Sequence, residues 1–224
     1  MTKKCGVLFS GGKDSCMAAY LAKQKDYDAK CLISVYSKNP DSYMFHTPSI
    51  KRTKQQAKAM EMPLLIQKTK GEKEEELKDL EKAIKKAKTK YKIDTIVTGA
   101  IKSEYQESRI KKICEKNKLE CFNPLWQKDE LECLNDLINN EFKVIITGVA
   151  AHPFDKTWLG RPIDREFIVN IVDIMNKYKI NPAGEGGEYE TFVLYCPLFK
   201  KSLTVKSQKI SGEKNSWRMD IEVE

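Results

Sequence analysis

The chain has 224 residues, of which 41% are hydrophobic and 32% charged, a composition typical of a folded globular protein that excludes a fibrous or disordered one. It contains no apolar run near the roughly 20 residues that a membrane span needs, and its first residues lead into a strand and not into a signal peptide. We expect a cytoplasmic protein without a membrane partner, large enough for one main domain and a smaller second one.

The net charge of +8 raises the question of a nucleic-acid partner. Only five of the 40 basic residues are arginines, whereas proteins that read nucleic acids use arginine for phosphates and base edges. A surface rich in lysine and interspersed with glutamate is more often a solvated face. We therefore expect no stable nucleic-acid partner.

The seven cysteines are scattered and never form a CxxC pair, which argues against a zinc site or a disulfide framework. Cys16 follows a glycine turn and could be a nucleophile. The alternative, a small apolar residue inside a helix, is the interpretation we favour.

The first half of the chain alternates short apolar runs with helical patterns, beginning with a strand over residues 5–9 and a helix over 14–25. Further strands are expected over 29–36, 63–67, 94–99 and 119–122, and further helices over 49–60, 72–91 and 103–117. Such alternation predicts an α/β fold, a doubly wound parallel sheet with helices on both faces.

In the second half of the chain the regular alternation of strands and helices ends. Helices are expected over 129–139 and 164–178, and strands over 142–149, 191–195, 202–210 and 217–223. The later strands alternate with period two, which predicts an antiparallel sheet and a smaller α+β lobe. We place the boundary so that residues 1–124 form a nucleotide-binding domain and residues 125–224 a substrate-binding domain. The last twenty residues carry no motif, and strand packing alone can account for them.

The turn between the first strand and the first helix reads SGGKDS. Free backbone amides and the helix dipole favour an anion at such a place. Lys13 adds positive charge, and we expect it to be exposed on the turn and not part of the core. The adjacent glycines distinguish the turn from the kinase-type phosphate loop. The predicted phosphate-binding residues are Ser10, Gly11, Gly12, Lys13, Asp14 and Ser15.

This turn resembles the pyrophosphate loop of the N-type ATP pyrophosphatases, which have a HUP-like fold similar to that of the adenine nucleotide alpha hydrolases. In those enzymes the loop holds the β- and γ-phosphates of ATP as a leaving group, and the α-phosphate stays open to attack. The resemblance therefore implies ATP as a substrate and an adenylate as the intermediate.

Two further segments are similar to motifs of the diphthine–ammonia ligases: GAIKSEYQESR at residues 99–109 and GEGGEYETF at residues 184–192. The resemblance runs from residue 5 to residue 203. It implies additional contacts to the nucleotide from Gly99, Ser103, Tyr105, Gln106 and Arg109.

Membership of that family implies ATP-dependent amidation of diphthine in translation elongation factor 2 with ammonium, through an acyl adenylate, with release of AMP and pyrophosphate. Lys13, Glu185 and Glu188 become the catalytic candidates, and Asp14 the candidate ligand for Mg²⁺. A glutamate of the second motif either deprotonates ammonium or holds the quaternary ammonium of diphthine. His46 is a candidate contact to adenine, and a homodimer is left open.

Two alternatives to this function stay open. One is another pyrophosphatase-loop enzyme that acts on tRNA, which the positive charge permits, although it would need an RNA-binding lobe or sulfur-transfer cysteines. The other is an ATP-binding regulator that shares the fold and performs no chemistry.

Overall fold

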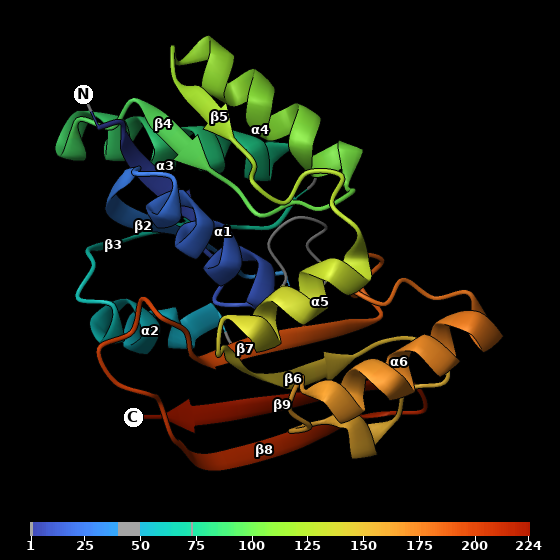
Figure 1. Ribbon diagram of the computed structural model, residues 1–224. Coiled ribbons are helices and arrows are strands. Elements are labelled where there is room, and N and C mark those ends of the chain that lie inside the picture. Colours follow the sequence, from blue (N-terminus) through green and yellow to red (C-terminus); the bar gives the residue numbers. More distant parts are fainter. Residues whose placement is uncertain (1, 40–49, 73) are drawn as a thin grey trace.

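The computed structural model describes residues 2–39, 50–72 and 74–224, so His46 lies outside the described residues. Five parallel strands form its first sheet, in the order β3-β2-β1-β4-β5 (Figure 1). They are β1 (Lys4–Leu8), β2 (Asp28–Ser37), β3 (Leu64–Thr69), β4 (Thr95–Val97) and β5 (Glu120–Phe122). The order reverses between β1 and β4, and ligands of open α/β sheets bind beyond the carboxyl ends of the strands at such a point.

Helices cover both faces of this sheet because each strand is apolar on both sides. On one face Cys5 and Val7 pack against α1 (Lys13–Gln24) and α2 (Thr53–Ala59), the latter preceded by a 3-10 turn, η1 (Ile50–Arg52). On the other face Ile33 and Val35 pack against α3 (Glu75–Tyr91) and α4 (Glu104–Lys116). The predicted doubly wound fold is confirmed.

The second sheet is antiparallel, in the order β7-β6-β9-β8. Its strands are β6 (Lys143–Val149), β7 (Tyr189–Tyr195), β8 (Val205–Glu213) and β9 (Ser216–Val223). The helices of this half are α5 (Glu130–Asn139) and α6 (Arg165–Tyr178), with a 3-10 turn, η2 (Lys156–Trp158), between them in sequence. The smaller α+β part of the prediction is therefore also present.

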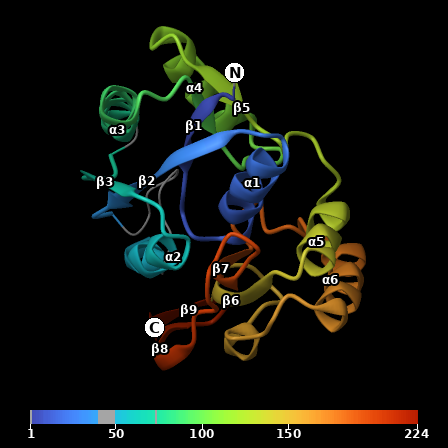
Figure 2. The ribbon, with the colours of Figure 1, turned by 60° about the vertical axis from the view of Figure 1, so that its left-hand side comes forward.

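Helix α1 lies between the two sheets and contacts both (Figures 1 and 2). One apolar core continues from β1 and α1 into β6, β7 and β9. Because this core is shared, the first turn of α1 is held from both halves of the chain. No helix in the described ranges is long and apolar enough to cross a membrane.

Candidate functional site

A cavity of about 610 Å³ opens at the switch point of the parallel sheet, between it and the antiparallel sheet. Its walls come from the phosphate loop, the β4–α4 loop, the glycine-rich loop before β7, and strands of the second sheet. Of the predicted site residues, the cavity is lined by Ser10, Gly12, Lys13, Asp14, Ser15, Gly99, Ser103, Gln106 and Glu185. Segments far apart in the sequence thus meet at one site.

The phosphate loop is shaped by its own last residue. The Ser15 hydroxyl accepts hydrogen bonds from the amides of Ser10 and Gly11, at 3.3 and 3.2 Å, and donates to the Gly12 carbonyl at 3.0 Å. Gly11 adopts φ +83°, a conformation that favours glycine. Its carbonyl accepts from Gln56 Nε2 at 2.8 Å. Ser15 and Gly11 therefore fix the turn that presents the other loop residues.

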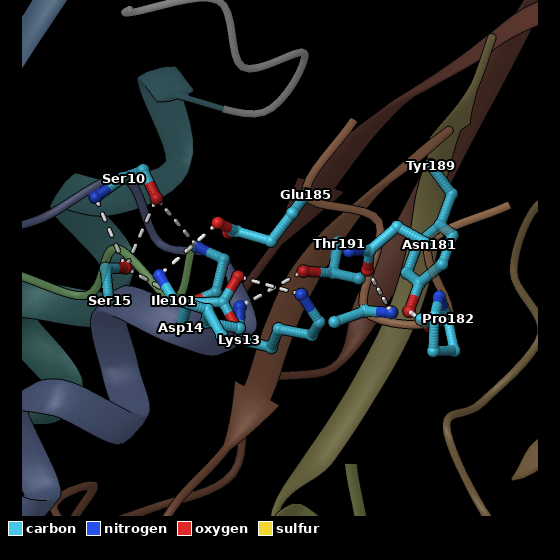
Figure 3. A network of polar contacts seen from close by, with 12 residues as sticks. Ser10, Lys13, Asp14, Ser15, Ile101, Asn181, Pro182, Glu185, Tyr189 and Thr191 are labelled. Atoms are coloured by element: carbon cyan, nitrogen blue, oxygen red, sulfur yellow. Dashed lines mark hydrogen bonds and ion pairs between the residues drawn. The ribbon is translucent and has the colours of Figure 1, made fainter. Parts of the chain in front are cut away.

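Lys13 is buried, with 4% of its surface exposed, so the expectation of an exposed lysine was wrong. Its ammonium group lies 2.8 Å from an Asp14 carboxylate oxygen and 5.7 Å from the centroid of the Tyr189 ring (Figure 3). Its amide donates to the Thr191 hydroxyl at 3.0 Å, which caps α1 because Gly12 has no side chain to do so. The second sheet covers this turn, which the local sequence could not indicate.

The β4–α4 loop lies directly on the start of α1. A Cβ atom added at Gly99 would be 2.6 Å from the Asp14 carbonyl oxygen, so only glycine permits this approach. Ser103 accepts from the Gln106 amide and caps α4. The predicted ATP contacts of these three residues stay predictions, and the structure brings all three to the cavity.

Tyr105 and Arg109 lie on α4 and are not among the described residues that line the cavity. The Arg109 guanidinium stacks 3.5 Å from the centroid of the Tyr105 ring and donates to Glu74 at 3.0 Å. The structure does not bring this pair together with the phosphate loop, and their contact with the nucleotide stays a prediction.

Glu185 reaches from the glycine-rich loop toward the phosphate loop (Figure 3). One carboxylate oxygen accepts from the amides of Ile101 and Lys102, at 3.3 and 3.0 Å. Burial and the negative charge of Asp14 raise the pKa of this carboxyl, and the amides and Lys13 oppose the rise. A carboxyl of raised pKa beside a phosphate loop is suited to proton transfer.

Glu188 holds its own loop together. Its carboxylate accepts from the Asn181 amide at 2.9 Å, while the neighbouring Tyr189 hydroxyl donates to the Pro182 carbonyl at 2.6 Å. Within the described part of the chain, Glu188 is absent from the cavity lining. The contacts of Glu188 therefore stabilise the conformation of its loop. Its predicted catalytic role stays a prediction.

Glu190 and the start of β9, Ser216 to Arg218, also line the cavity. Sequence reasoning did not assign them to the site, and it treated the C-terminal residues as strand packing. Glu190 lies in the GEGGEYETF motif, and the signal for Arg218 was that it is one of five arginines in a lysine-rich chain. Strand β9 reaches the cavity because it pairs with β6, with Val149 opposite Trp217 although the two residues are 68 positions apart in the sequence.

Because the Glu190 carboxyl is buried, we expect the stability of the fold to depend on pH. Burial raises the pKa of its carboxyl to about 8, although Arg218 lowers it. A carboxyl whose folded-state pKa is raised destabilises the fold increasingly as the pH rises from about 4.3, the unfolded-state value, through 8. Glu190→Gln removes this cost, so its melting temperature relative to the wild type should rise between about pH 5 and pH 8. Each kcal/mol of unfolding free energy corresponds to a shift of about 2–4 °C in the melting temperature of a protein of this size. Thermal melts at both pH values check this, and a constant difference would contradict it.

The structure also bears on the predicted Mg²⁺ ligand, Asp14, and on the possible cysteine nucleophile, Cys16. In residues 2–39, 50–72 and 74–224, no three His, Cys, Asp or Glu side chains gather as a metal site. Mg²⁺ commonly binds to one or two carboxylates plus phosphate oxygens and water, so Asp14 fits the ion only together with a nucleotide. Cys16 is fully buried and its thiol pKa is raised well above the ordinary value by burial, which does not suit a nucleophile.

Comparison with known proteins decides the family. The family model described as the diphthamide synthase N-terminal domain matches residues 3–121, and the one described as the C-terminal domain matches residues 129–223. The chain belongs to the diphthamide synthase family. The predicted resemblance to diphthine–ammonia ligases is thereby confirmed.

Relatives of the diphthamide synthase family are similar over nearly the whole chain. The diphthine–ammonia ligase of Bos taurus is 32% identical, that of Homo sapiens 31% and that of Mus musculus 33%; each match covers 92% of this chain and 84% of the relative. A solved structure described as a predicted subunit of tRNA methyltransferase from Methanocaldococcus jannaschii is 20% identical, with a TM-score of 0.44, over 89% of this chain and 99% of that one. A similarity at this level says nothing about function.

Proposed function

We propose that this chain amidates diphthine in translation elongation factor 2, using ATP and ammonium and releasing AMP and pyrophosphate. The observation that carries the proposal is the convergence of a pyrophosphatase-type loop and both family motifs on one cavity, in a chain of the diphthamide synthase family. Residues 1–124 supply the nucleotide side of the cavity and residues 125–224 the substrate side. The free cysteines suit the reducing cytoplasm, where we place the reaction.

The chemistry requires a carboxylate oxygen of diphthine to attack the α-phosphorus of ATP, forming an acyl adenylate and expelling pyrophosphate. Loop amides and the Lys13 ammonium would stabilise the charge on the leaving pyrophosphate. Asp14, beside Lys13, would help to hold Mg²⁺, which neutralises phosphate charge when bound. Ammonia then attacks the acyl carbon, and AMP leaves. Glu185 is the carboxyl best placed to take a proton from ammonium.

Incorporation of nitrogen tests the amidation. The protein is incubated with ATP, heavy-nitrogen ammonium and elongation factor that carries diphthine, and the modified peptide is analysed by mass spectrometry. We expect the heavy nitrogen in the modified histidine, and only when ATP is present. Absence of label with an active factor preparation would reject the proposed reaction.

The nucleotide products test the adenylation. Because the loop differs from the kinase-type pattern, we expect AMP and pyrophosphate in equal amounts with the amidated factor. Ion-exchange chromatography of the nucleotides separates AMP from ADP. ADP and phosphate as the main products would exclude an acyl adenylate and point to an acyl phosphate.

A further inference from the structure

Gln56 is a polar side chain on helix α2 that is completely buried, with no part of its surface exposed. Its amide nitrogen donates to the carbonyl oxygens of Gly11 and Val193, each at 2.8 Å. The Val193 amide donates to the same Gly11 oxygen at 3.1 Å. Both hydrogens of the Gln56 side-chain amide are thus used. The side chain therefore joins the phosphate loop to strand β7 of the second sheet.

Stability alone does not explain a glutamine at this position. Its side-chain oxygen is buried and has no hydrogen-bond partner in the described part of the chain. A buried acceptor without a donor costs free energy, and an apolar side chain of the same length avoids that cost. The side-chain amide cannot turn round to relieve it, because the carbonyl oxygens of Gly11 and Val193 can only accept. What the glutamine supplies is a pair of donors beside the phosphate loop.

The carbonyl that Gln56 holds belongs to the trans peptide between Gly11 and Gly12. In a trans peptide the carbonyl oxygen and the amide hydrogen point in opposite directions, so holding the Gly11 oxygen also fixes the direction of the Gly12 N–H. Gly12 lines the cavity, whereas Gln56 and Val193 are not among the described residues that do so. The Gly12 nitrogen is 3.4 Å from the hydroxyl oxygen of Ser10, a long contact, and Ser10 also lines the cavity. The Gly12 amide therefore faces the side on which a ligand of the loop would lie.

Two adjacent glycines make the reversed orientation of this peptide accessible. Gly11 has φ +83°, and neither glycine carries a side chain that would block a rotation of the peptide between them. In the reversed peptide the Gly11 oxygen would face the cavity and repel a phosphate. The two hydrogen bonds on that oxygen, from Gln56 and Val193, oppose the reversal.

We propose that Gln56 is a positioning residue for the pyrophosphate site, where it holds the Gly11–Gly12 peptide so that the Gly12 amide donates to the leaving pyrophosphate. This role rests on the proposed function, because it takes the loop to hold that leaving group. A donor that is oriented in advance stabilises developing negative charge without a cost of reorientation. Gln56 acts through Gly12 and does not itself touch the phosphates.

Binding of two parts of the nucleotide tests the role of Gln56. Inorganic pyrophosphate and AMP are titrated calorimetrically, each with Mg²⁺, into the wild type and into Gln56→Met, which keeps the side-chain length without the donors. We expect Gln56→Met to weaken pyrophosphate binding about 10- to 100-fold, the range for a hydrogen bond to a charged group. AMP lacks the β- and γ-phosphates, so its affinity should not change. Gln55→Met, the same change one position earlier on α2, should match the wild type.

The wild-type protein offers a test that does not depend on the folding of a variant. In assigned amide NMR spectra the Gly12 proton should move downfield when pyrophosphate is added. The Gly11 amide, which already donates to the Ser15 hydroxyl, should move less. A Gly12 proton that does not move overturns the proposed role, and so does an unchanged pyrophosphate affinity in Gln56→Met. Equal weakening of pyrophosphate and AMP would make Gln56 a packing residue and overturn it as well.

Kinetics separate this role from the proposed function. In the amidation assay Gln56→Met should lower kcat by up to about 10²- to 10³-fold, the loss for one missing donor, with the KM for the diphthine-bearing factor unchanged. A change confined to that KM would contradict a role at the leaving group. Pyrophosphate binding that depends on Gln56, in a protein that amidates no factor, would leave the positioning role intact and reject the proposed function.

Discussion

Replacement of Lys13 by alanine should reduce pyrophosphate release by at least about 10²- to 10³-fold, the loss seen when one donor to a developing negative charge is removed. The ammonium group lies in the cavity wall at the first turn of α1, where the charge of the leaving pyrophosphate would develop. It also neutralises Asp14 at 2.8 Å, so the variant leaves that carboxylate without its cation. Turnover and melting temperature are therefore measured together.

Two variants separate chemistry from folding. Lys13→Met keeps most of the buried side-chain volume without the charge, and should be folded and inactive. Lys23→Ala removes an exposed lysine from the last turn of the same helix and should behave as the wild type. A folded Lys13→Met protein with wild-type pyrophosphate release would show that the loop is not the phosphate site.

Glu185→Gln should lower the amidation rate by about 10²- to 10⁴-fold, the range for loss of general acid–base assistance, with ATP affinity nearly unchanged. The amide oxygen of glutamine can still accept from the Ile101 and Lys102 amides, so the loop keeps its position. What is lost is the titratable group beside Lys13 and Asp14. Single-turnover amidation measures the rate, and equilibrium binding measures the affinity.

Glu188→Gln is the matched control for Glu185→Gln. It changes the same residue type three positions further along the same loop, outside the cavity wall. We expect it to lower the amidation rate less than Glu185→Gln does. A loss for Glu185→Gln confined to affinity for the elongation factor would assign the carboxylate to the substrate cation. Wild-type kinetics in both variants would make the two glutamates structural.

The sequence predicted the fold well because its signals are local. Apolar runs followed by helical patterns indicated the five parallel strands, and the glycines of SGGKDS indicated the turn after the first of them. Two boundaries differ from the prediction. The strand expected over 202–210 begins at Val205. The described part of the helix expected over 49–60 consists of the 3-10 turn η1 followed by α2. The division of the chain near residue 124 stays a prediction.

The site was less predictable because its remaining features depend on contacts between distant residues. The burial of Lys13 requires Thr191 and Tyr189 from β7, and nothing in the loop itself indicates them. Arg218 enters the cavity through pairing of β9 with β6, and strand pairing between distant segments is not encoded in a short motif. Glu185 and Glu188 look equivalent in the sequence, and only the structure separates their surroundings.

Pyrophosphate release in the presence of three forms of elongation factor 2 tests the central claim most directly. The protein is supplied with ATP, Mg²⁺ and ammonium, and the factor carries unmodified histidine, diphthine or diphthamide. We predict rapid release only with the diphthine form, and loss of that release in Lys13→Met. Release at the same rate with all forms, or none with any, would contradict the assignment of this cavity to ATP-dependent amidation of diphthine.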